Sequence, residues 1–360
     1  MALVAVTVAA LWGCDSTPQV RFHTADDYPE RLSEWGVVTR SGSSLRLGRG
    51  AIPYDVNTPL FSDYALKLRT LHLPDDEAMA YREPAAFEFP VGSIVTKTFF
   101  YPVRDGVLQT AEWDGDVQAL DLADHRLVET RLLVRQRDGW DALPYVWDGD
   151  DAYLAVTGTV EPLRVAQDGA VQEVPYVVPA RSECAGCHAT DHSSGELRLI
   201  GLKARHLNRP YAGRGANQLR AWAARGHLTG LPALPEVPRN AVWNDSKQSV
   251  AARARAYLDS NCGHCHNRRG PADTSGLLLD AGTERFRSLG VCKPPIAAGR
   301  GTGGRPYSIV PGAPDASILL YRMETTDPAT RMPETGRALT HHEGVRLIRR
   351  WIEDLPGECV

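Results

Sequence analysis

A chain of 360 residues is long enough for two or three domains, each with a core of its own. Its formal net charge of -4 and its isoelectric point near 6.3 argue against a protein that binds nucleic acid or another polyanion. With 43% hydrophobic and 23% charged residues, the composition is ordinary for a soluble globular protein.

The first 20 residues have the pattern of an export signal. An almost unbroken apolar stretch runs from Ala2 to Trp12, which is too short to span a membrane and suits the hydrophobic region of a signal peptide. The segment Leu11-Trp-Gly-Cys14 resembles a bacterial lipobox, after which Cys14 would carry a lipid. We therefore expect a periplasmic protein, either tethered to the membrane through Cys14 or released by ordinary signal cleavage.

Residues 21–180 are expected to form a β-rich domain, either an antiparallel sandwich or a barrel. β-Branched and aromatic residues fill 94–101, and apolar residues alternate with charged ones over 127–134. Shorter strands are predicted over 145–147 and 154–156, with Asp-Gly turns between the strands. No motif in this region indicates an activity.

From Arg181 onward the predicted elements change from strands to helices. Residues 217–225 have the pattern of a short helix that begins after Asn217. The proline-rich stretch 231–238 is expected to separate two mainly α-helical modules, 181–235 and 236–360. In the second module, helices are predicted over 246–259 and from a capping box at residues 340–343 to Leu355.

Each predicted module contains one Cys-x-x-Cys-His run. The first run is Cys184-Ala-Gly-Cys187-His188 and the second is Cys262-Gly-His-Cys265-His266. This pattern is the attachment signal for c-type haem. Its two thiols form thioethers with the porphyrin vinyl groups, and the adjacent histidine ligates the iron. Two such runs in a chain with only seven cysteines predict two covalently bound haem c groups, with His188 and His266 as iron ligands.

Zinc is the alternative to haem at these cysteines. Paired Cys-x-x-Cys knuckles can build a tetrahedral site from Cys184, Cys187, Cys262 and Cys265. That chemistry does not require a histidine directly after each second cysteine. The gap between the two runs is also far longer than the usual spacing of zinc knuckles.

A thioether or a second imidazole is the usual sixth ligand of such an iron. Met332 precedes Pro333, which restricts the methionine to extended backbone and could hold its sulfur toward a ring. We predict that Met332 ligates the second haem. No methionine lies between the two runs, so the first haem has His206 or His227 as candidate ligands, or an open position.

Two cysteines remain after Cys14 and the four cysteines of the runs are assigned. These are Cys292 and Cys359. An oxidising compartment could join them in a disulfide, and two unrelated reduced thiols are the alternative.

Several short blocks of this sequence carry a family resemblance. They are Asn57-Thr-Pro-Leu-Phe-Ser-Asp63, Phe89-Pro-Val-Gly92, Glu129-Thr-Arg131, Asp151-Ala152, Leu207-Asn208, Asn217-Gln218-Leu219 and Arg331-Met332-Pro333. Through them, and through both Cys-x-x-Cys-His runs, the chain resembles a bacterial family of diheme c-type cytochromes with a β-rich N-terminal domain. The last module is also similar to class I cytochrome c, through residues 310–317 and the terminal helix. The resemblance assigns no activity to the β-rich domain.

Together these features favour a diheme cytochrome that carries electrons between redox proteins, such as a dehydrogenase and a terminal acceptor. An electron carrier is favoured over an enzyme, and no catalytic residue is assigned. One alternative is a haem enzyme, similar to a diheme peroxidase or an oxidase, with an open site at the first haem. The other alternative is that the β-rich domain binds a substrate or a partner enzyme, and that the cytochrome modules carry electrons away from it.

Overall fold

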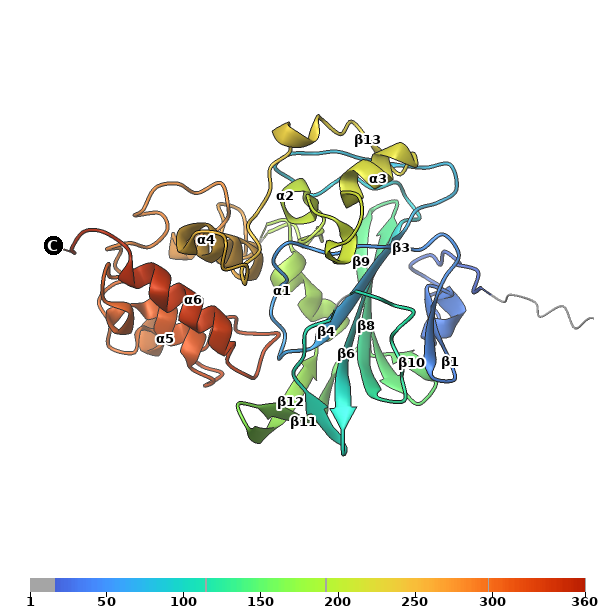
Figure 1. The fold of residues 1–360 in the computed structure, drawn as a ribbon, viewed down its shortest axis with the longest axis horizontal. Coiled ribbons are helices and arrows are strands. Elements are labelled where there is room, and N and C mark those ends of the chain that lie inside the picture. The colour runs from blue at the N-terminus through green and yellow to red at the C-terminus, as the bar shows by residue number, and fades with distance from the viewer. Residues whose placement is uncertain (1–16, 114, 192, 297, 360) are drawn as a thin grey trace, which may run out of the picture.

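The computed structural model describes residues 17–359 except 114, 192 and 297 (Figure 1). Cys14 and most of the expected signal peptide therefore lie outside the described residues. Within this range no helix is long and apolar enough to cross a membrane.

Strands occupy the first half of the described chain and short helices follow them (Figure 1). The strands are β1 (Val38–Ser41), β2 (Ser44–Leu47), β3 (Ile52–Pro53), β4 (Leu66–His72), β5 (Met79–Ala80), β6 (Ile94–Arg104), β7 (Val107–Gln109), β8 (His125–Gln136), β9 (Gly139–Asp148), β10 (Asp151–Leu154), β11 (Thr159–Gln167), β12 (Ala170–Val178) and β13 (Leu228–Thr229). The helices are α1 (Ala185–His188), α2 (Ala204–Leu207), α3 (Gln218–Ala224), α4 (Val250–Asn261), α5 (Ile318–Glu324) and α6 (His342–Glu353).

One nine-stranded sheet dominates the fold. Its main path runs β10-β9-β8-β6-β7-β11-β12, and β4 with β3 extends it from the edge of β6 opposite β8. Every pairing in this sheet is antiparallel except that of β7 with β11. The strands predicted over 94–101 and 127–134 are confirmed, because they lie within β6 and β8.

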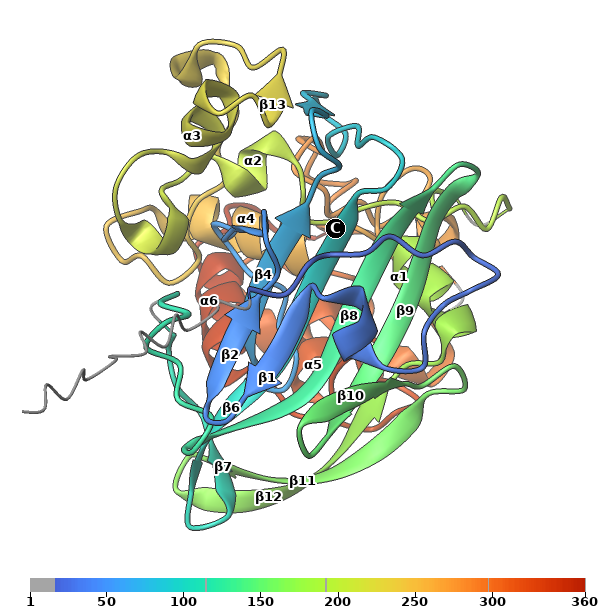
Figure 2. The same ribbon diagram turned by 90° about the vertical axis from the view of Figure 1, so that its right-hand side faces the viewer.

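The face of the sheet turned toward the N-terminal segment is apolar. Ile94 and Leu132 pack against Trp35, and Phe100 packs with Val38 of the β1–β2 hairpin. Figure 2 shows this hairpin lying in front of the sheet. The N-terminal segment thus covers this face of the sheet, and its own Trp35 and Val38 are buried there.

The opposite face carries the second half of the chain. At one end of β6, Val95 packs with Leu207 and Trp222 from the segment after the first run. Toward the other end, Phe99 and Tyr101 form a core with β11 and β12. Charged side chains, Lys97 among them, lie between these two apolar regions.

The expectation of two mainly α-helical modules is wrong. Helices α1 and α2 have four residues each and α3 and α5 have seven, whereas only α4 and α6 reach twelve. Turns and loops make up most of the chain after Arg181. Glycine and proline explain this difference, since both disfavour helix interiors and residues 294–304 alone contain two prolines and four glycines.

Helices α4 and α6 form the helical part of the C-terminal segment (Figure 1). Ala254 and Leu258 of α4 share an apolar cluster with Val345 and Ile348 of α6. The Ser249 side chain caps α4 by accepting a hydrogen bond from the Ala252 N–H at 3.2 Å. The predicted capping box is wrong, because α6 begins after His341 and has no side-chain cap.

Residues 57–63, which connect β3 to β4, tie the sheet to both later parts of the chain. This segment bonds to α2, to the end of α4 and to the loop before α6. Its hydrogen bonds run from Asn57 Nδ2 to Arg205 O (3.0 Å), from Ser260 Oγ to Thr58 O (2.6 Å), from Phe61 N to Asn261 Oδ1 (2.8 Å) and from Leu339 N to Asp63 Oδ1 (2.7 Å).

Candidate functional site

The first run lies on one turn of helix directly after the sheet ends. A short 3₁₀ turn, Arg181–Cys184, continues into α1, so that Cys184, Cys187 and His188 follow one another within two turns. The Glu183 carboxylate closes this turn by accepting the Ala180 N–H at 2.8 Å. The residues of the run are therefore held by local hydrogen bonds.

His188 has the hydrogen bonding of a metal-ligating histidine. Its Nδ1 lies 2.8 Å from the Arg198 carbonyl oxygen, so Nδ1 carries the proton and donates it. The lone pair of Nε2 is then free for a metal, which is the arrangement that fixes ligating histidines in proteins. Burial lowers the pKa of His188 to about 4 and so keeps the imidazole neutral at pH 7, as ligation requires.

A cleft of about 800 Å³ lies beside α1, between the first run and strand β9. Trp140, Asp141, Arg181 and Ala185 are among the residues that line it. Its volume is within the range of cofactor and small-molecule sites. The first run therefore borders open space of a size that suits a cofactor.

The second run begins where α4 ends. Cys262 follows the last residue of α4, and the His266 N–H donates to the Cys262 carbonyl at 2.8 Å, which folds the run into a turn. His266 Nδ1 lies 3.3 Å from Ser275 Oγ, so this histidine too has a partner at Nδ1. Burial lowers the pKa of His266 to about 4. Both histidines predicted from the sequence as iron ligands thus have a hydrogen-bond partner at Nδ1 and a lowered pKa, and for His188 the carbonyl partner also fixes the tautomer.

The structure brings the two runs together. One ligand atom each of Cys187, His264 and Cys265 lies within 4.8 Å of the others. The Cys265 Sγ is also 3.8 Å from the Gly186 carbonyl oxygen. The two runs, which are far apart in the sequence, therefore meet at these three residues. A hydrogen bond from the Cys265 thiol also holds the pKa of Cys187 below its ordinary value.

Arg198 links the two runs directly. Its carbonyl oxygen accepts the His188 Nδ1 proton, and its guanidinium donates to the His264 carbonyl oxygen at 3.0 Å. The sequence alone did not single out this residue, because nothing in its local pattern marks it. It is a positioning residue that acts on both runs.

Met332 lies in a loop that one buried arginine holds in place. Arg337, which is 5% exposed, donates through Nε to the Met332 carbonyl oxygen at 2.9 Å. The Met332 N–H in turn donates to the Arg322 carbonyl oxygen at 2.7 Å. Arg322 is also close enough to His266 for its charge to act on that imidazole, after the larger effect of burial on the pKa. Met332 and His266 therefore lie in the same part of the C-terminal segment, both near Arg322.

The two histidine candidates for the first iron lie elsewhere. His206 is buried in α2, and its Nε2 is 3.5 Å from the Asp259 carboxylate. His227 directly precedes β13, and its carbonyl oxygen accepts the Met79 N–H. No hydrogen bond or ion pair in the described part of the chain joins either histidine to the first run. Instead, His264 of the second run has a ring nitrogen within 4.8 Å of the Cys187 sulfur.

A zinc site of four cysteines does not form in this arrangement. Within residues 17–359, apart from the three undescribed positions, one group of metal-ligating side chains is close enough to share an ion. It contains Cys187 and Cys265 with His264, and neither Cys184 nor Cys262 belongs to it.

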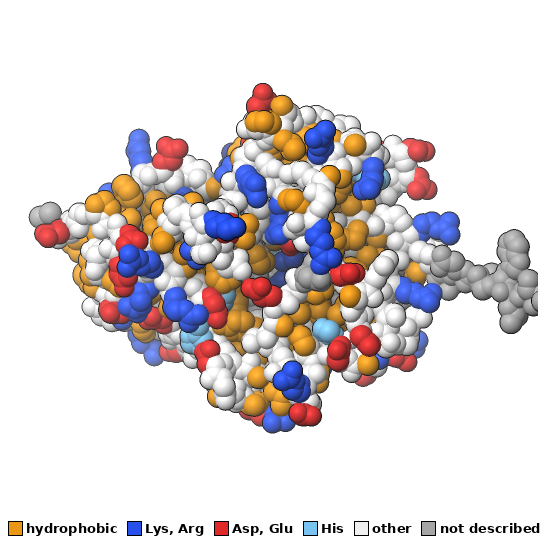
Figure 3. Space-filling view, viewed as in Figure 1, with side chains coloured by type: hydrophobic (Ala, Val, Ile, Leu, Met, Phe, Trp, Pro, Cys, Tyr) orange, Lys and Arg blue, Asp and Glu red, His pale blue; other side chains and the backbone are white. Residues whose placement is uncertain are grey.

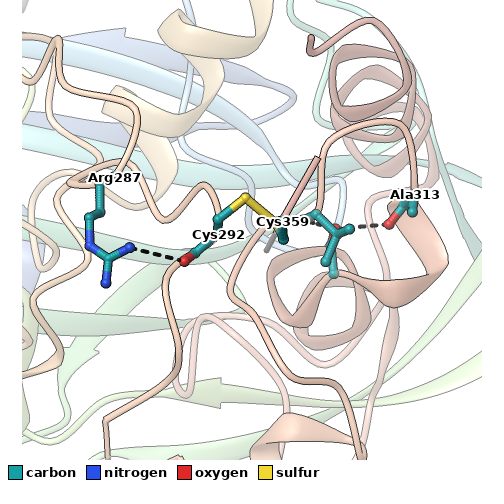
Figure 4. Close-up of a disulfide and its surroundings, with 6 residues drawn as sticks. Arg287, Cys292, Ala313 and Cys359 are labelled. Atoms are coloured by element: carbon teal, nitrogen blue, oxygen red, sulfur yellow. Dashed lines mark hydrogen bonds between the residues drawn. A yellow bond between two sulfur atoms is a disulfide. The ribbon is translucent and has the colours of Figure 1, made fainter. Parts of the chain in front are cut away.

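Cys292 and Cys359 form a disulfide with a Cα–Cα distance of 5.2 Å (Figure 4). It fixes the C-terminal end to the loop that precedes α5. The carbonyl oxygen of Cys292 also accepts a hydrogen bond from the Arg287 guanidinium at 3.3 Å (Figure 4). The two remaining thiols of the sequence analysis are thereby paired.

Basic side chains gather where the second half of the chain meets the sheet. Figure 3 shows Lys or Arg side chains at the bottom of a hollow near the middle of the molecule. On the face of the sheet that also carries Val95 and Phe99, the basic residues are Lys67, Arg69, Lys97 and Arg131. The sequence carried one signal for them, since Lys97 interrupts an otherwise apolar and β-branched strand.

A scan against protein-family models, a search of curated proteins and a search of solved structures gave no match. The resemblance to diheme cytochromes therefore rests on the sequence blocks and the two runs alone. The residues present fit haem at both histidines, as their hydrogen bonds and neutral state indicate.

Proposed function

We propose that this protein is a periplasmic diheme c-type cytochrome that carries electrons between redox partners. One haem would be attached at Cys184 and Cys187 and the other at Cys262 and Cys265. The observation that carries the proposal is the meeting of the two Cys-x-x-Cys-His runs at Cys187, His264 and Cys265. Two cofactors attached at runs that meet in this way would lie close enough to exchange an electron within the chain.

When bound, each haem c supplies one-electron chemistry at its iron. The chain's own residues hold and orient the group. His188 and His266 present neutral imidazoles whose orientation is fixed at Nδ1. Arg337 holds the backbone of Met332, the proposed sixth ligand of the second haem. The partners that we propose are other redox proteins, a dehydrogenase on one side and a terminal acceptor on the other.

Export belongs to the same proposal. Covalent attachment of haem c in bacteria takes place outside the cytoplasm, so the N-terminal signal pattern and the two runs fit one location. Lipidation at Cys14 would tether the protein to the membrane. The disulfide between Cys292 and Cys359 supports an oxidising compartment.

The experiment that tests the proposal is expression in a periplasm with an active haem c maturation system. The purified protein is expected to keep two haems per chain after denaturation, as measured by the haem absorbance in alkaline pyridine and by mass spectrometry. Cys184→Ser and Cys262→Ser should each reduce that number to one haem held by two thioethers. A wild-type chain without covalent haem contradicts the proposal.

A haem enzyme is the second candidate, because His206 pairs with Asp259 and neither it nor His227 reaches the first run. An open position at the first haem would bind small ligands. Added carbon monoxide should then change the spectrum of one reduced haem, and added hydrogen peroxide should be consumed. An unchanged spectrum without peroxide turnover favours the electron carrier.

Zinc is the third candidate, and the cluster of Cys187, His264 and Cys265 favours it over the four-cysteine site. The same preparation distinguishes zinc from haem. Elemental analysis of protein purified from the periplasm should give two irons and no zinc per chain. One zinc ion and no iron would support the metal cluster instead.

A further inference from the structure

The two Cys-x-x-Cys-His runs meet through one cysteine of each. The sulfur atoms of Cys187 and Cys265 lie no more than 4.8 Å apart, and a ring nitrogen of His264 is within the same distance of both. The Cys265 Sγ also lies 3.8 Å from the carbonyl oxygen of Gly186, which directly precedes Cys187. The Cys265 thiol therefore lies against both the side chain and the backbone of the other run.

Arg198 holds the two runs in this arrangement. Its carbonyl oxygen accepts the His188 Nδ1 proton at 2.8 Å, and its guanidinium donates to the His264 carbonyl oxygen at 3.0 Å. The side chain of His264 is itself only 5% exposed. Because Arg198 bonds to a residue of each run, the fold of both segments keeps the thiols of Cys187 and Cys265 near each other.

The other cysteine of each run makes its contacts elsewhere. The Cys184 thiol donates to the Ala180 carbonyl oxygen, 3.7 Å away, just after the last strand of the sheet. Cys262 packs against the apolar cluster that α4 and α6 share. Neither sulfur atom belongs to the group of ligand atoms that the described part of the chain brings together. The contacts of the four thiols therefore favour a bond between Cys187 and Cys265 over a bond within either run.

We propose that Cys187 and Cys265 form a disulfide in the chain before haem is attached, which brings their sulfur atoms to about 2.05 Å. The oxidant that we infer is itself a disulfide, either of a small molecule or of a protein. One protein thiol attacks a sulfur atom of the oxidant and releases a first thiol, and the second protein thiol then displaces the other half. The two protein thiols lose two electrons and two protons, which leave with the oxidant as its two thiols.

An oxidant can reach this pair of cysteines. Both Cys187 and Cys265 are partly exposed, and thiol–disulfide exchange requires access to the attacking sulfur. The bond between Cys292 and Cys359 shows that the chain already carries one disulfide. Such bonds form and persist in oxidising compartments, and the proposed export would place the unmodified runs in one.

The disulfide would regulate haem attachment, and this consequence rests on the proposed function, whereas the bond itself does not. Each haem needs both thiols of its run. The bond between Cys187 and Cys265 uses one thiol from each run, so a single disulfide would close both attachment sites. A reductant would open both sites in one step.

The test uses the full chain, expressed in a periplasm without haem c maturation and then exposed to glutathione disulfide. Trypsin releases the first run within residues 182–198 and the second run within residues 256–268. Mass spectrometry without reductant should find these two peptides joined in the wild-type chain. The peptides joined through Cys292 and Cys359 show in the same digest that the chain has folded and been oxidised.

Four single variants identify the cysteines that join the two runs. Cys187→Ser and Cys265→Ser should each lose the joined peptides. Cys184→Ser and Cys262→Ser are the matched controls, because each removes a thiol from a run without touching the meeting point, and both should keep the joined peptides. Haem added to the oxidised wild-type chain should become covalently attached only after treatment with dithiothreitol.

Three results would overturn the inference: disulfides within each run, joined peptides that persist in Cys187→Ser or Cys265→Ser, or free thiols at both positions in the oxidised chain. Haem attachment to the oxidised chain without a reductant would refute the regulatory consequence. Haem content is measured separately, after expression with the maturation system. A wild-type chain without covalent haem there contradicts the proposed function, whereas two haems per chain without joined peptides in the unmatured chain contradict this inference alone.

Discussion

The phenol of Tyr257 in α4 occupies the space beside Gly344 in α6 where any other residue would place its Cβ. The Tyr257 hydroxyl is also 2.9 Å from Nδ1 of His341, which borders the same space. The two longest helices therefore cross at a point that admits only glycine. Tyr257 precedes Cys262, where the second run begins, by five residues, so the crossing fixes the part of α4 from which that run leaves.

Gly344→Ala should lower the free energy of unfolding by about 1–3 kcal/mol, because the added methyl group must displace Tyr257 or separate the helices. Urea denaturation of the holoprotein measures the change. Gly201→Ala is the matched control, since a Cβ there meets open space and the backbone of Gly201 is not left-handed. Equal stability of both variants would show that the helices do not cross this closely.

Met332→Ala should lower one midpoint potential and leave the other unchanged. A neutral thioether leaves the ferric charge poorly compensated, so its loss stabilises the oxidised form, by about 0.1–0.3 V within the range of about 0.8 V that axial ligands span. Spectroelectrochemical titration measures both potentials. Met323→Leu is the control, because Met323 is buried in the apolar cluster of α5 and α6. Two unchanged potentials in Met332→Ala would refute the ligand assignment.

Acid should destabilise the protein between pH 6.5 and pH 4. Burial lowers the pKa of His341 and of His206 to about 4 in the folded state, whereas the unfolded chain binds these protons near pH 6.5. The unfolded state therefore takes up protons first as the pH falls. Each histidine then removes up to about 1.4 kcal/mol of stability per pH unit in this window.

The pH effect can be assigned to His341 by substitution. Unfolding free energies of His341→Gln at pH 7, 6 and 5 should fall less steeply than those of wild type, by the contribution of one proton. His342→Gln, at a neighbouring position that is 42% exposed, is the control for the effect of a histidine substitution on stability at pH 7. A His341→Gln slope equal to that of wild type would mean that the folded imidazole titrates normally.

Loss of the Cys292–Cys359 disulfide should cost about 4 kcal/mol, the chain-entropy value for a loop closed over 67 residues. The double variant Cys292→Ser/Cys359→Ser avoids an unpaired thiol. Its urea midpoint should match that of wild type kept in reductant, provided the haem content of both is equal. No difference between oxidised wild type and the double variant would contradict a closed loop in the native protein.

The sheet was the more predictable part of this fold. β-Branched residues and alternation are local signals, so β6 and β8 followed from the sequence. The second half was not predictable in the same way. Helix α6 has clear periodicity, whereas that of α4 is weak and the loops around α1 to α3 follow from packing on Val95 and Trp222 that no local pattern records.

The candidate site shows the same contrast between local sequence signals and contacts of distant segments. Cysteine spacing identified both runs because the Cys-x-x-Cys-His pattern is a local signal. Cys187 meets Cys265 through a contact between distant segments of the chain. Lys97 lies opposite Arg131 because of the strand register. The sequence contained Lys97 as an anomaly in an apolar strand, and only the register showed that two arginines flank it.

Residues 57–63 hold α2, the end of α4 and the loop before α6 against the sheet through hydrogen bonds from one short connection. Such a connection makes the three predicted regions a single cooperative unit, because none of them can detach without breaking bonds to it. Neither segment that carries a Cys-x-x-Cys-His run should then survive as an isolated fragment, and recombination could not exchange one with another protein. The sequence looks modular because its motifs follow one another in order. The apparent modules would thus not be separate units of inheritance.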